Sequence, residues 1–233
     1  MRELVFDTET TGFSAENGDR MVEIGMVELI DKRMTGNNLH LYFNPEKTIS
    51  DEVIAVHHLT NEFLSDKPKF TEMAEEILKY IGDDSVLIAH NAAFDMSFLN
   101  TELLKAGKSA IDPSRFIDTL LLSRRKYPQY SKHSLDAICR RLDISLDERE
   151  KQGHGALLDS LLLVKVYFDL TDKKELDLTG NSDKDFLQEK INLSDLYKDA
   201  VKKDFRIVLP TADEVKSHDE FLAKFKTPTI WNT

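Results

Sequence analysis

Short apolar runs alternate with amphipathic stretches from the start of the chain to about residue 170. This alternation is typical of a β-sheet covered by helices. Three runs separated by turn-rich pieces predict the strands of an antiparallel meander: Glu3 to Asp7, Met21 to Ile30 and Asn38 to Phe43. A later apolar run, Ser85 to His90, predicts a buried strand.

Apolar residues recur at helical spacing in five later segments. The first segment, Phe70 to Ile81, is followed by Gly82, a residue that commonly ends a helix. The mixture of strands and helices predicts an α/β fold with a mixed sheet. The other four helical segments are Ala93 to Ala106, Ile117 to Lys126, Ser134 to Leu142 and Gly155 to Leu170.

The composition of the chain changes after Leu170. Residues 171–185 are rich in charge and hold too few apolar side chains to bury a core, which predicts a linker. Apolar islands return in residues 187–201, 205–210 and 212–225. We therefore predict one folded domain followed by a linker and a short tail.

The overall composition excludes several classes of protein. With 41% hydrophobic residues among 233, the chain can bury one sizeable core. No apolar run approaches the roughly 18 residues of a membrane helix, and the N-terminus does not resemble a signal peptide. The single cysteine, Cys139, allows no intramolecular disulfide and no thiolate zinc cluster. We expect a cytoplasmic protein with Cys139 in its core.

The net charge bears on the kind of partner. The 31 Lys and Arg residues against 42 Asp and Glu give −11, which disfavours nucleic acid because basic side chains supply most sequence-independent DNA affinity. A cluster of carboxylates that binds Mg²⁺ would explain the acidity differently. The segment from Thr171 onward holds 11 basic and 13 acidic residues, so most of the negative charge lies in the predicted domain.

Two acidic side chains follow the first predicted strand. Asp7 and Glu9, in the run FDTETTG, are two residues apart and so point to the same side of the strand. Carboxylates this close repel each other unless a cation lies between them. Taken alone, such a pair is more often a polar strand end that faces water.

Two later motifs bring further candidates. Asp95, in HNAAFD, begins a predicted helix for which Asn91 can act as N-cap, so capping and catalysis are equally good interpretations. His154 and Asp159, in GHGALLDS, open the last helix. A histidine between two glycines can swing, and an ordinary pKa of about 6.5 suits a general base. The alternative is an exposed loop histidine.

Together and in this order, the motifs resemble the DnaQ-like exonucleases of the DEDDh type. The chain is most similar to the family of proofreading epsilon subunits of bacterial DNA polymerase III over residues 1–170. Further shared stretches are VEIG from Val22, MTGNNLHLYFNP from Met34, VHHL from Val56, HSLDAICRRLDI from His133 and, in the tail, PTADEVKSHDEFL from Pro210.

The resemblance implies a ribonuclease H-like mixed sheet of five strands flanked by helices. It also implies a 3′-to-5′ exonuclease that releases nucleoside 5′-monophosphates from mispaired DNA during replication. Two Mg²⁺ or Mn²⁺ ions would be held by four acids, with His154 as general base in a two-metal-ion mechanism. The four acids are Asp7, Glu9, Asp95 and Asp159.

Substrate and partner contacts follow from the same resemblance. Glu52 and His57 would contact the terminal nucleotide of a frayed or single-stranded 3′ end of DNA, which Asp7, Glu9 and Asp159 also face. Residues 200–233 would bind the polymerase alpha subunit after a flexible linker of residues 171–199. The peptide ELDLT, Glu175 to Thr179, loosely resembles a sliding-clamp-binding sequence but departs from it at both ends.

Two other interpretations stay open. A DEDDh exoribonuclease that trims RNA 3′ ends would carry the same four acids and histidine, although the tail favours the polymerase subunit. A mainly structural polymerase subunit would be expected to lack a catalytic residue, and none is missing here.

Overall fold

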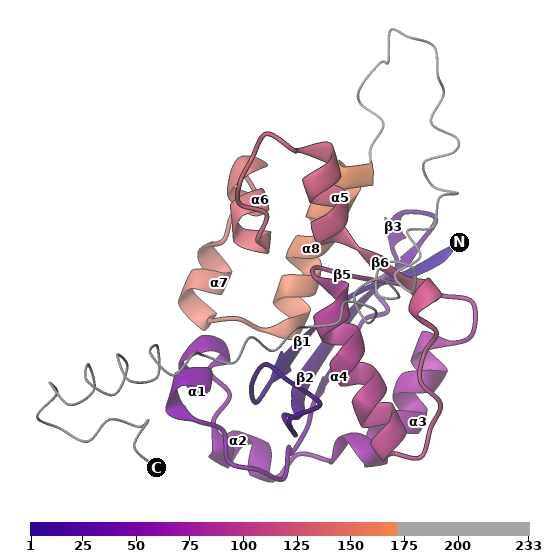
Figure 1. The fold of residues 1–233 in the computed structure, drawn as a ribbon, viewed down its shortest axis with the longest axis vertical. Helices are drawn as coiled ribbons and strands as arrows, with labels where there is room; N and C mark the ends of the chain where they lie inside the picture. Colours follow the sequence, from indigo (N-terminus) through magenta and orange to yellow (C-terminus); the bar gives the residue numbers. More distant parts are fainter. Residues whose placement is uncertain (172–233) are drawn as a thin grey trace, which may run out of the picture. The chain divides into compact units, whose positions relative to one another are not determined.

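The computed structural model of the protein describes residues 1–171, and its core is a mixed sheet flanked by helices (Figure 1). The predicted linker, the docking segment and the peptide Glu175 to Thr179 lie outside the described residues. The strands are β1 Arg2–Thr10, β2 Met21–Ile30, β3 Arg33–Met34, β4 Leu39–Tyr42, β5 Val86–Ala89 and β6 Phe116–Asp118. The helices are α1 Asp51–His57, α2 Asn61–Ser65, α3 Phe70–Ile81, α4 Ala92–Lys105, the 3₁₀ helix Pro113–Arg115, α5 Thr119–Lys126, α6 Leu135–Arg141, α7 Asp147–Gln152 and α8 Ala156–Thr171.

The sheet has the order β3-β2-β1-β5-β6, and β4 also pairs with β2. The predicted meander is confirmed, because β2 pairs antiparallel with β1 and with β4. Strands β5 and β6 extend the sheet in parallel with β1. Parallel strands end at the same edge, so the residues after β5 meet the end of β1.

Two short strands differ from the expectation. The pair Asp31 and Lys32 forms a tight turn at positive φ, and β3 then adds a sixth strand to the five that the resemblance implies. The helix predicted from Ile117 begins instead at Thr119, because Phe116–Asp118 forms β6 and Asp118 accepts the N–H of Leu120 as N-cap. Strands of two or three residues are too short to show an alternating pattern.

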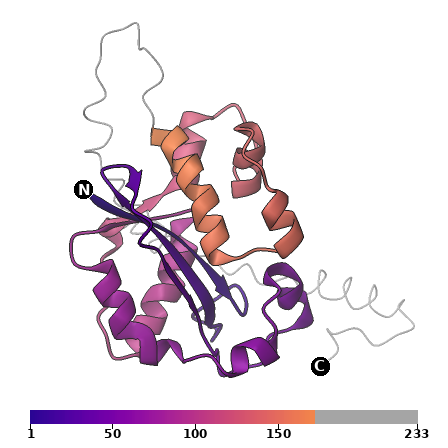
Figure 2. The ribbon, with the colours of Figure 1, turned by 180° about the vertical axis from the view of Figure 1, so that it is seen from behind.

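The sheet buries a separate core on each face. Leu4 and Phe6 of β1 pack with α3 and α4, whereas Val5, on the opposite face, packs with α5, α6 and α8. Figures 1 and 2 show these two groups of helices apart from each other. Cys139 is fully buried in the second core, as predicted. None of the helices in residues 1–171 is both long and apolar enough to span a bilayer.

Candidate active site

Asp7 and Glu9 lie on the face of β1 that α8 covers. Side chains of a strand alternate, so both acids share the face of Val5, which packs against α8. Gly25 and Glu23 of β2 are their direct cross-strand partners. Glu9 is 9% exposed, so its carboxylate has lost most of its contact with water.

Helix α8 crosses β2 in backbone contact at Gly25. A Cβ at this position would lie 2.2 Å from the backbone nitrogen of Leu157, so only glycine fits. The Ser160 hydroxyl donates a hydrogen bond to the Gly25 carbonyl at 2.9 Å. These contacts fix the first turns of α8 and bring Asp159 to the acids of β1.

Asp95 reaches the site from α4, on the other side of the sheet. The hydroxyl of Thr8, which points away from the Asp7 face, donates to Asp95 Oδ1 at 2.7 Å. Asn91 is the N-cap of α4, as predicted, but its side chain makes no capping bond. Its backbone is left-handed, with φ of 66°, and its N–H is accepted by Asp118 Oδ1 at 3.0 Å. Asp118 thus fixes the start of α4, a role that the sequence did not reveal.

The pKa of each of the four acids is raised, and burial is the largest cause for each. Burial and then repulsion by Asp95, Glu9 and Asp159 raise the pKa of Asp7 well above its usual value. Burial and repulsion by Asp159 raise the pKa of Glu9 to about 8, and burial raises that of Asp95 to about 7. Burial also raises the pKa of Asp159. Such a cluster favours the binding of a cation.

The loop that carries His154 is held against α1. The backbone N–H of His154 donates to the carbonyl of Val56 at 3.1 Å. Gly153 has φ of 81° and lies so close to His58 that a Cβ would be 2.7 Å from its Nδ1. The sequence had suggested that the glycines let His154 swing, whereas in the structure Gly153 is required for a close approach.

Arg149 of α7 is an active-site cation that the sequence did not single out. Its Nε and Nη2 lie 2.6 and 2.7 Å from the two carboxylate oxygens of Asp159. Nη2 also donates to Nδ1 of His154 at 2.8 Å, and Nη1 forms an ion pair with Asp136. No pattern in the charged run DEREKQ distinguishes this arginine from its neighbours.

The residues of the site fit a divalent cation. Glu9, His154 and Asp159 each offer a donor atom, and these atoms lie within 4.8 Å of one another. Carboxylate oxygens are the ligands that Mg²⁺ and Mn²⁺ prefer. Asp7 belongs to the same cluster of charge, because Asp95, Glu9 and Asp159 all help to raise its pKa.

Comparison with known proteins places the chain in a family. The family model described as "Exonuclease" matches residues 4–167, which include all four acids and His154. The chain belongs to this exonuclease family. The predicted class of enzyme is therefore confirmed, and members of the DEDDh type generally use divalent cations.

Similar exonucleases include proteins that match nearly the whole chain. The DNA polymerase III subunit epsilon of Rickettsia felis is 38% identical over 230 residues, which are 96% of each chain. The subunit of the same name from Haemophilus influenzae is 39% identical in a match that covers 95% of this chain and 89% of that one.

Solved structures of exonucleases share the fold. Exonuclease X, in complex with 5′ overhanging duplex DNA, is 26% identical with a TM-score of 0.56, covering 72% of this chain and 89% of that chain. The nuclease domain of 3′hExo, a DEDDh family member bound to rAMP, is 17% identical with a TM-score of 0.62, covering 72% and 90%. These likenesses confirm the predicted ribonuclease H-like fold.

The two predicted nucleotide contacts of this exonuclease have different surroundings. His57, which without the resemblance would be a surface residue, is only 3% exposed. Its Nδ1 accepts the N–H of Leu59 at 3.0 Å, so Nε2 carries the proton, and this buried atom has no partner. Glu52 is exposed in the first turn of α1, where it interacts with Ser50 rather than with the four acids.

A fifth acid beside the site was missed in the sequence. Glu23 is 2% exposed, forms an ion pair with Nε2 of His40 at 2.6 Å, and its charge helps to raise the pKa of Glu9. A charged residue in the middle of the apolar run MVEIGMVELI was the signal that could have revealed it.

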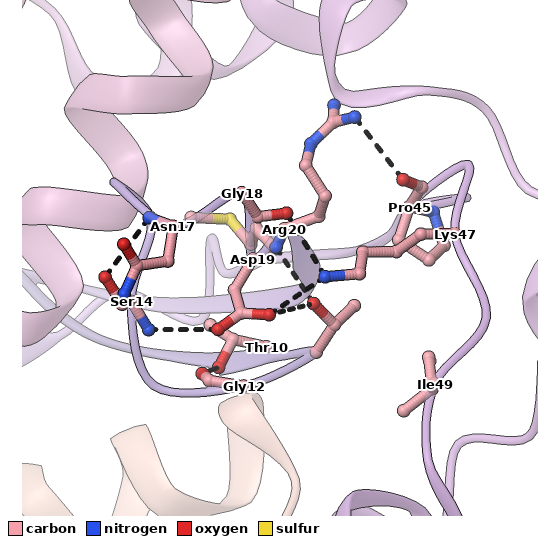
Figure 3. Close-up of polar contacts among 12 residues, drawn as sticks. Thr10, Gly12, Ser14, Asn17, Gly18, Asp19, Arg20, Pro45, Lys47 and Ile49 are labelled. Carbon is pink, nitrogen blue, oxygen red and sulfur yellow. Dashed lines mark hydrogen bonds and ion pairs between the residues drawn. The ribbon is translucent and has the colours of Figure 1, made fainter. Parts of the chain in front are cut away.

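The loop that follows Glu9 is braced by Asp19 (Figure 3). The Asp19 carboxylate accepts the backbone N–H of Ser14 at 3.1 Å and lies 3.0 Å from Nζ of Lys47. A Cβ on Gly12 would lie 2.3 Å from Asp19 Oδ2, so a side chain at this position would displace the carboxylate that braces the loop. Phe13 is 89% exposed next to this turn.

Proposed function

We propose that this exonuclease removes mispaired nucleotides from the 3′ end of DNA as the proofreading subunit of a bacterial replicative polymerase. The observation that carries the proposal is the length of the match to the epsilon subunits, which covers 95–96% of this chain and so extends beyond the exonuclease domain. The products would be nucleoside 5′-monophosphates. A DEDDh exoribonuclease made of the first domain alone would not account for the shared tail.

The four acids are the proposed ligands of two Mg²⁺ or Mn²⁺ ions. When bound, such ions lower the pKa of a water molecule and offset negative charge on the phosphate. Asp7, Glu9 and Asp159 would also face the substrate. The raised pKa values of Asp7, Glu9 and Asp95 support this assignment, because these carboxylates lack the counter-charge that they need to ionise fully.

His154 is the proposed general base, and it would take a proton from the attacking water. Burial, and then the charge of Arg149, lower the pKa of His154, so its imidazole is neutral and can accept a proton at neutral pH. In the structure, however, Nδ1 of His154 accepts a hydrogen bond from Arg149. The base can act at Nδ1 only when this contact is released.

Three residues besides the acids are the proposed contacts of the terminal nucleotide. The Nε2–H of His57 is a buried donor without a protein partner, which supports its assignment. Phe13 exposes a ring on which a base can stack. The role of Glu52 rests on the family resemblance alone. A mismatched end unpairs at lower cost than a matched one, so a site that accepts single strands selects it.

The remaining proposals concern partners. We infer that residues 200–233 bind the polymerase alpha subunit after a flexible linker of residues 171–199, and that Glu175 to Thr179 contacts the sliding clamp. The protein would then work in the cytoplasm at the replisome. The inference that residues 200–233 bind the alpha subunit is supported by the match to the epsilon subunits, which covers nearly the whole chain. The charge of −11 predicts weak DNA binding by the isolated protein.

The test is hydrolysis of three substrates by the purified chain. We expect a primer with a mispaired 3′ end to be shortened faster than a matched primer, and single-stranded RNA of the same sequence more slowly than either. Omission of Mg²⁺ should stop all three reactions. Faster cleavage of RNA would favour the exoribonuclease, and cleavage of none would favour a structural subunit.

A truncated chain separates catalysis from docking. Deletion of residues 200–233 should leave hydrolysis of free mispaired DNA unchanged and abolish co-elution with the alpha subunit. Undiminished co-elution would refute the docking role of the tail.

A further inference from the structure

Arg149 brings a positive charge into direct contact with the acids of the active site. Its side chain is only 10% exposed, and its charge lowers the pKa of Asp7, Glu9 and Asp159 against the other effects that raise them. The acids therefore have a resident counter-charge supplied by the protein. The proposed mechanism gives this arginine no role.

The contact with Asp159 uses both oxygens of the carboxylate. Nη2 donates a hydrogen bond to Oδ2 at 2.7 Å, and Nε lies 2.6 Å from Oδ1 in an ion pair without a hydrogen bond. A divalent cation that bound Asp159 would compete with the guanidinium for at least one of these oxygens. Arg149 thus contacts carboxylate oxygens of Asp159 that a cation would bind.

The same guanidinium occupies a nitrogen of His154. Nη2 lies 2.8 Å from Nδ1, and because arginine has no acceptor, Nδ1 must be the acceptor. The neutral imidazole then carries its proton on Nε2. While this contact persists, Nδ1 has no lone pair free for a proton from water.

Asp136 gives the guanidinium a second anchor outside the cluster. Nη1 forms an ion pair with Asp136, which lies in the first turn of α6 and whose side chain is 42% exposed. Asp159, by contrast, is 4% exposed. Arg149 can therefore leave the buried carboxylate and keep a carboxylate partner on α6.

We propose that Arg149 is a positioning residue that holds Asp159 and His154 together before a cation binds, and that cation binding displaces it from Asp159. Asp136 retains the guanidinium after the exchange. Displacement frees Nδ1 of His154, so the base becomes available only in the loaded site. This inference rests on the proposed function for the identity of the cation site.

The first test is Mn²⁺ binding to the full chain without DNA, measured by titration calorimetry. We expect Arg149→Gln to bind Mn²⁺ at least about tenfold more tightly than the natural chain, because a competing charge has been removed. Arg149→Lys keeps the charge and should stay within about threefold. The matched control is Arg140→Gln on neighbouring α6, whose arginine is 67% exposed and should leave affinity and activity unchanged.

The second test separates positioning from a general loss of structure. Arg149→Gln and Arg149→Lys should both lower kcat for a mispaired primer about tenfold or more with little change in KM, because neither side chain contacts Asp159 and His154 with one rigid, planar group. Nitrogen NMR of the metal-free chain should show Nδ1 of His154 as a hydrogen-bonded acceptor, and Arg149→Gln should lose that signature. A merely structural role would lower kcat without tightening Mn²⁺ binding.

The results distinguish this inference from the proposed function. Tighter Mn²⁺ binding by Arg149→Gln, together with no cleavage of mispaired DNA by the natural chain, would support the role of Arg149 and refute the proposed function. Mn²⁺ binding by Arg149→Gln no tighter than that of the natural chain would overturn the role of Arg149, whatever the activity. If Arg149→Gln does not fold, Mn²⁺ binding by Arg149→Lys more than about threefold tighter than that of the natural chain would overturn it instead.

Discussion

Two ends of the same strand bury acids in different ways. Glu3, at the start of β1, shares a face with Asp7, near its end. Glu3 is fully buried and accepts hydrogen bonds from Nζ of Lys32 and the hydroxyl of Tyr167, both at 2.7 Å. Lys32 also lies over the Tyr167 ring at 3.9 Å. A single acid at this end thus has its own cation and its own hydroxyl donor.

The other end has too little positive charge for its acids. Asp7 faces Glu9, Asp95 and Asp159, and Arg149 contacts only the last of these directly. Tyr167 and Asp159 both belong to α8, so the same strand and helix form both clusters. The comparison indicates that burial of an acid is not itself a sign of function. An uncompensated group of acids is the sign, because it leaves a place for a ligand's charge.

The largest expected effect is the loss of activity on substitution of Asp7, at the end of β1 where the acids lack positive charge. Asp7→Asn should lower kcat at least about a thousandfold in the primer assay, because a proposed cation ligand is lost. The melting temperature of the metal-free protein should not fall, because one repelling charge has been removed. Near-normal cleavage by Asp7→Asn would contradict the metal assignment.

The matching substitution at the other end should have the opposite effects. Glu3→Gln should lower the free energy of unfolding by about 2 kcal/mol, less than a fully buried pair would lose because Lys32 is 38% exposed. At low temperature kcat should stay within about twofold of the natural value. Urea denaturation measures the first effect, with exposed Glu76→Gln as the control. A Glu3→Gln variant that is as stable as the natural chain but inactive would contradict the difference between the two ends of β1.

The last and, for each pH unit, the smallest expected effect is a dependence of stability on pH. The pKa of Glu9 rises from 4.5 to about 8 on folding, and that of Asp95 from 3.8 to about 7. Protonation of these acids therefore favours the folded state. This contribution to stability is fully present below the pKa of each acid in the unfolded chain and is lost as the pH rises through its pKa in the folded chain.

Without divalent cations, the free energy of unfolding should fall by about 1 kcal/mol per pH unit between pH 5 and pH 8. Added Mg²⁺ should reduce the decline, because it binds the ionised acids. Urea denaturation in EDTA and in Mg²⁺ measures both. A metal-free protein that became more stable over this range would show that the acids are compensated.

Much of the fold was predictable from local patterns. The meander strands are apolar runs separated by turn-rich pieces, and the helix Phe70–Ile81 has a clear period of 3.6 residues, so their positions agreed with the structure. β6 was missed because three residues show no period. Asn91 was correctly predicted as an N-cap, but its capping partner is Asp118, 27 residues away, which no local pattern reveals.

The candidate site also has features that the sequence predicts and features that it does not. The sequence by itself determined which chemistry is available, because two acids on one strand, an acid after another strand and a histidine before a helix can be recognised locally. Only the tertiary structure decided that Gly25 lets α8 bring Asp159 to β1, and that Arg149 lies between Asp159 and His154. These facts depend on backbone approach and on charge balance between distant segments, and such contacts leave no period or spacing in the chain.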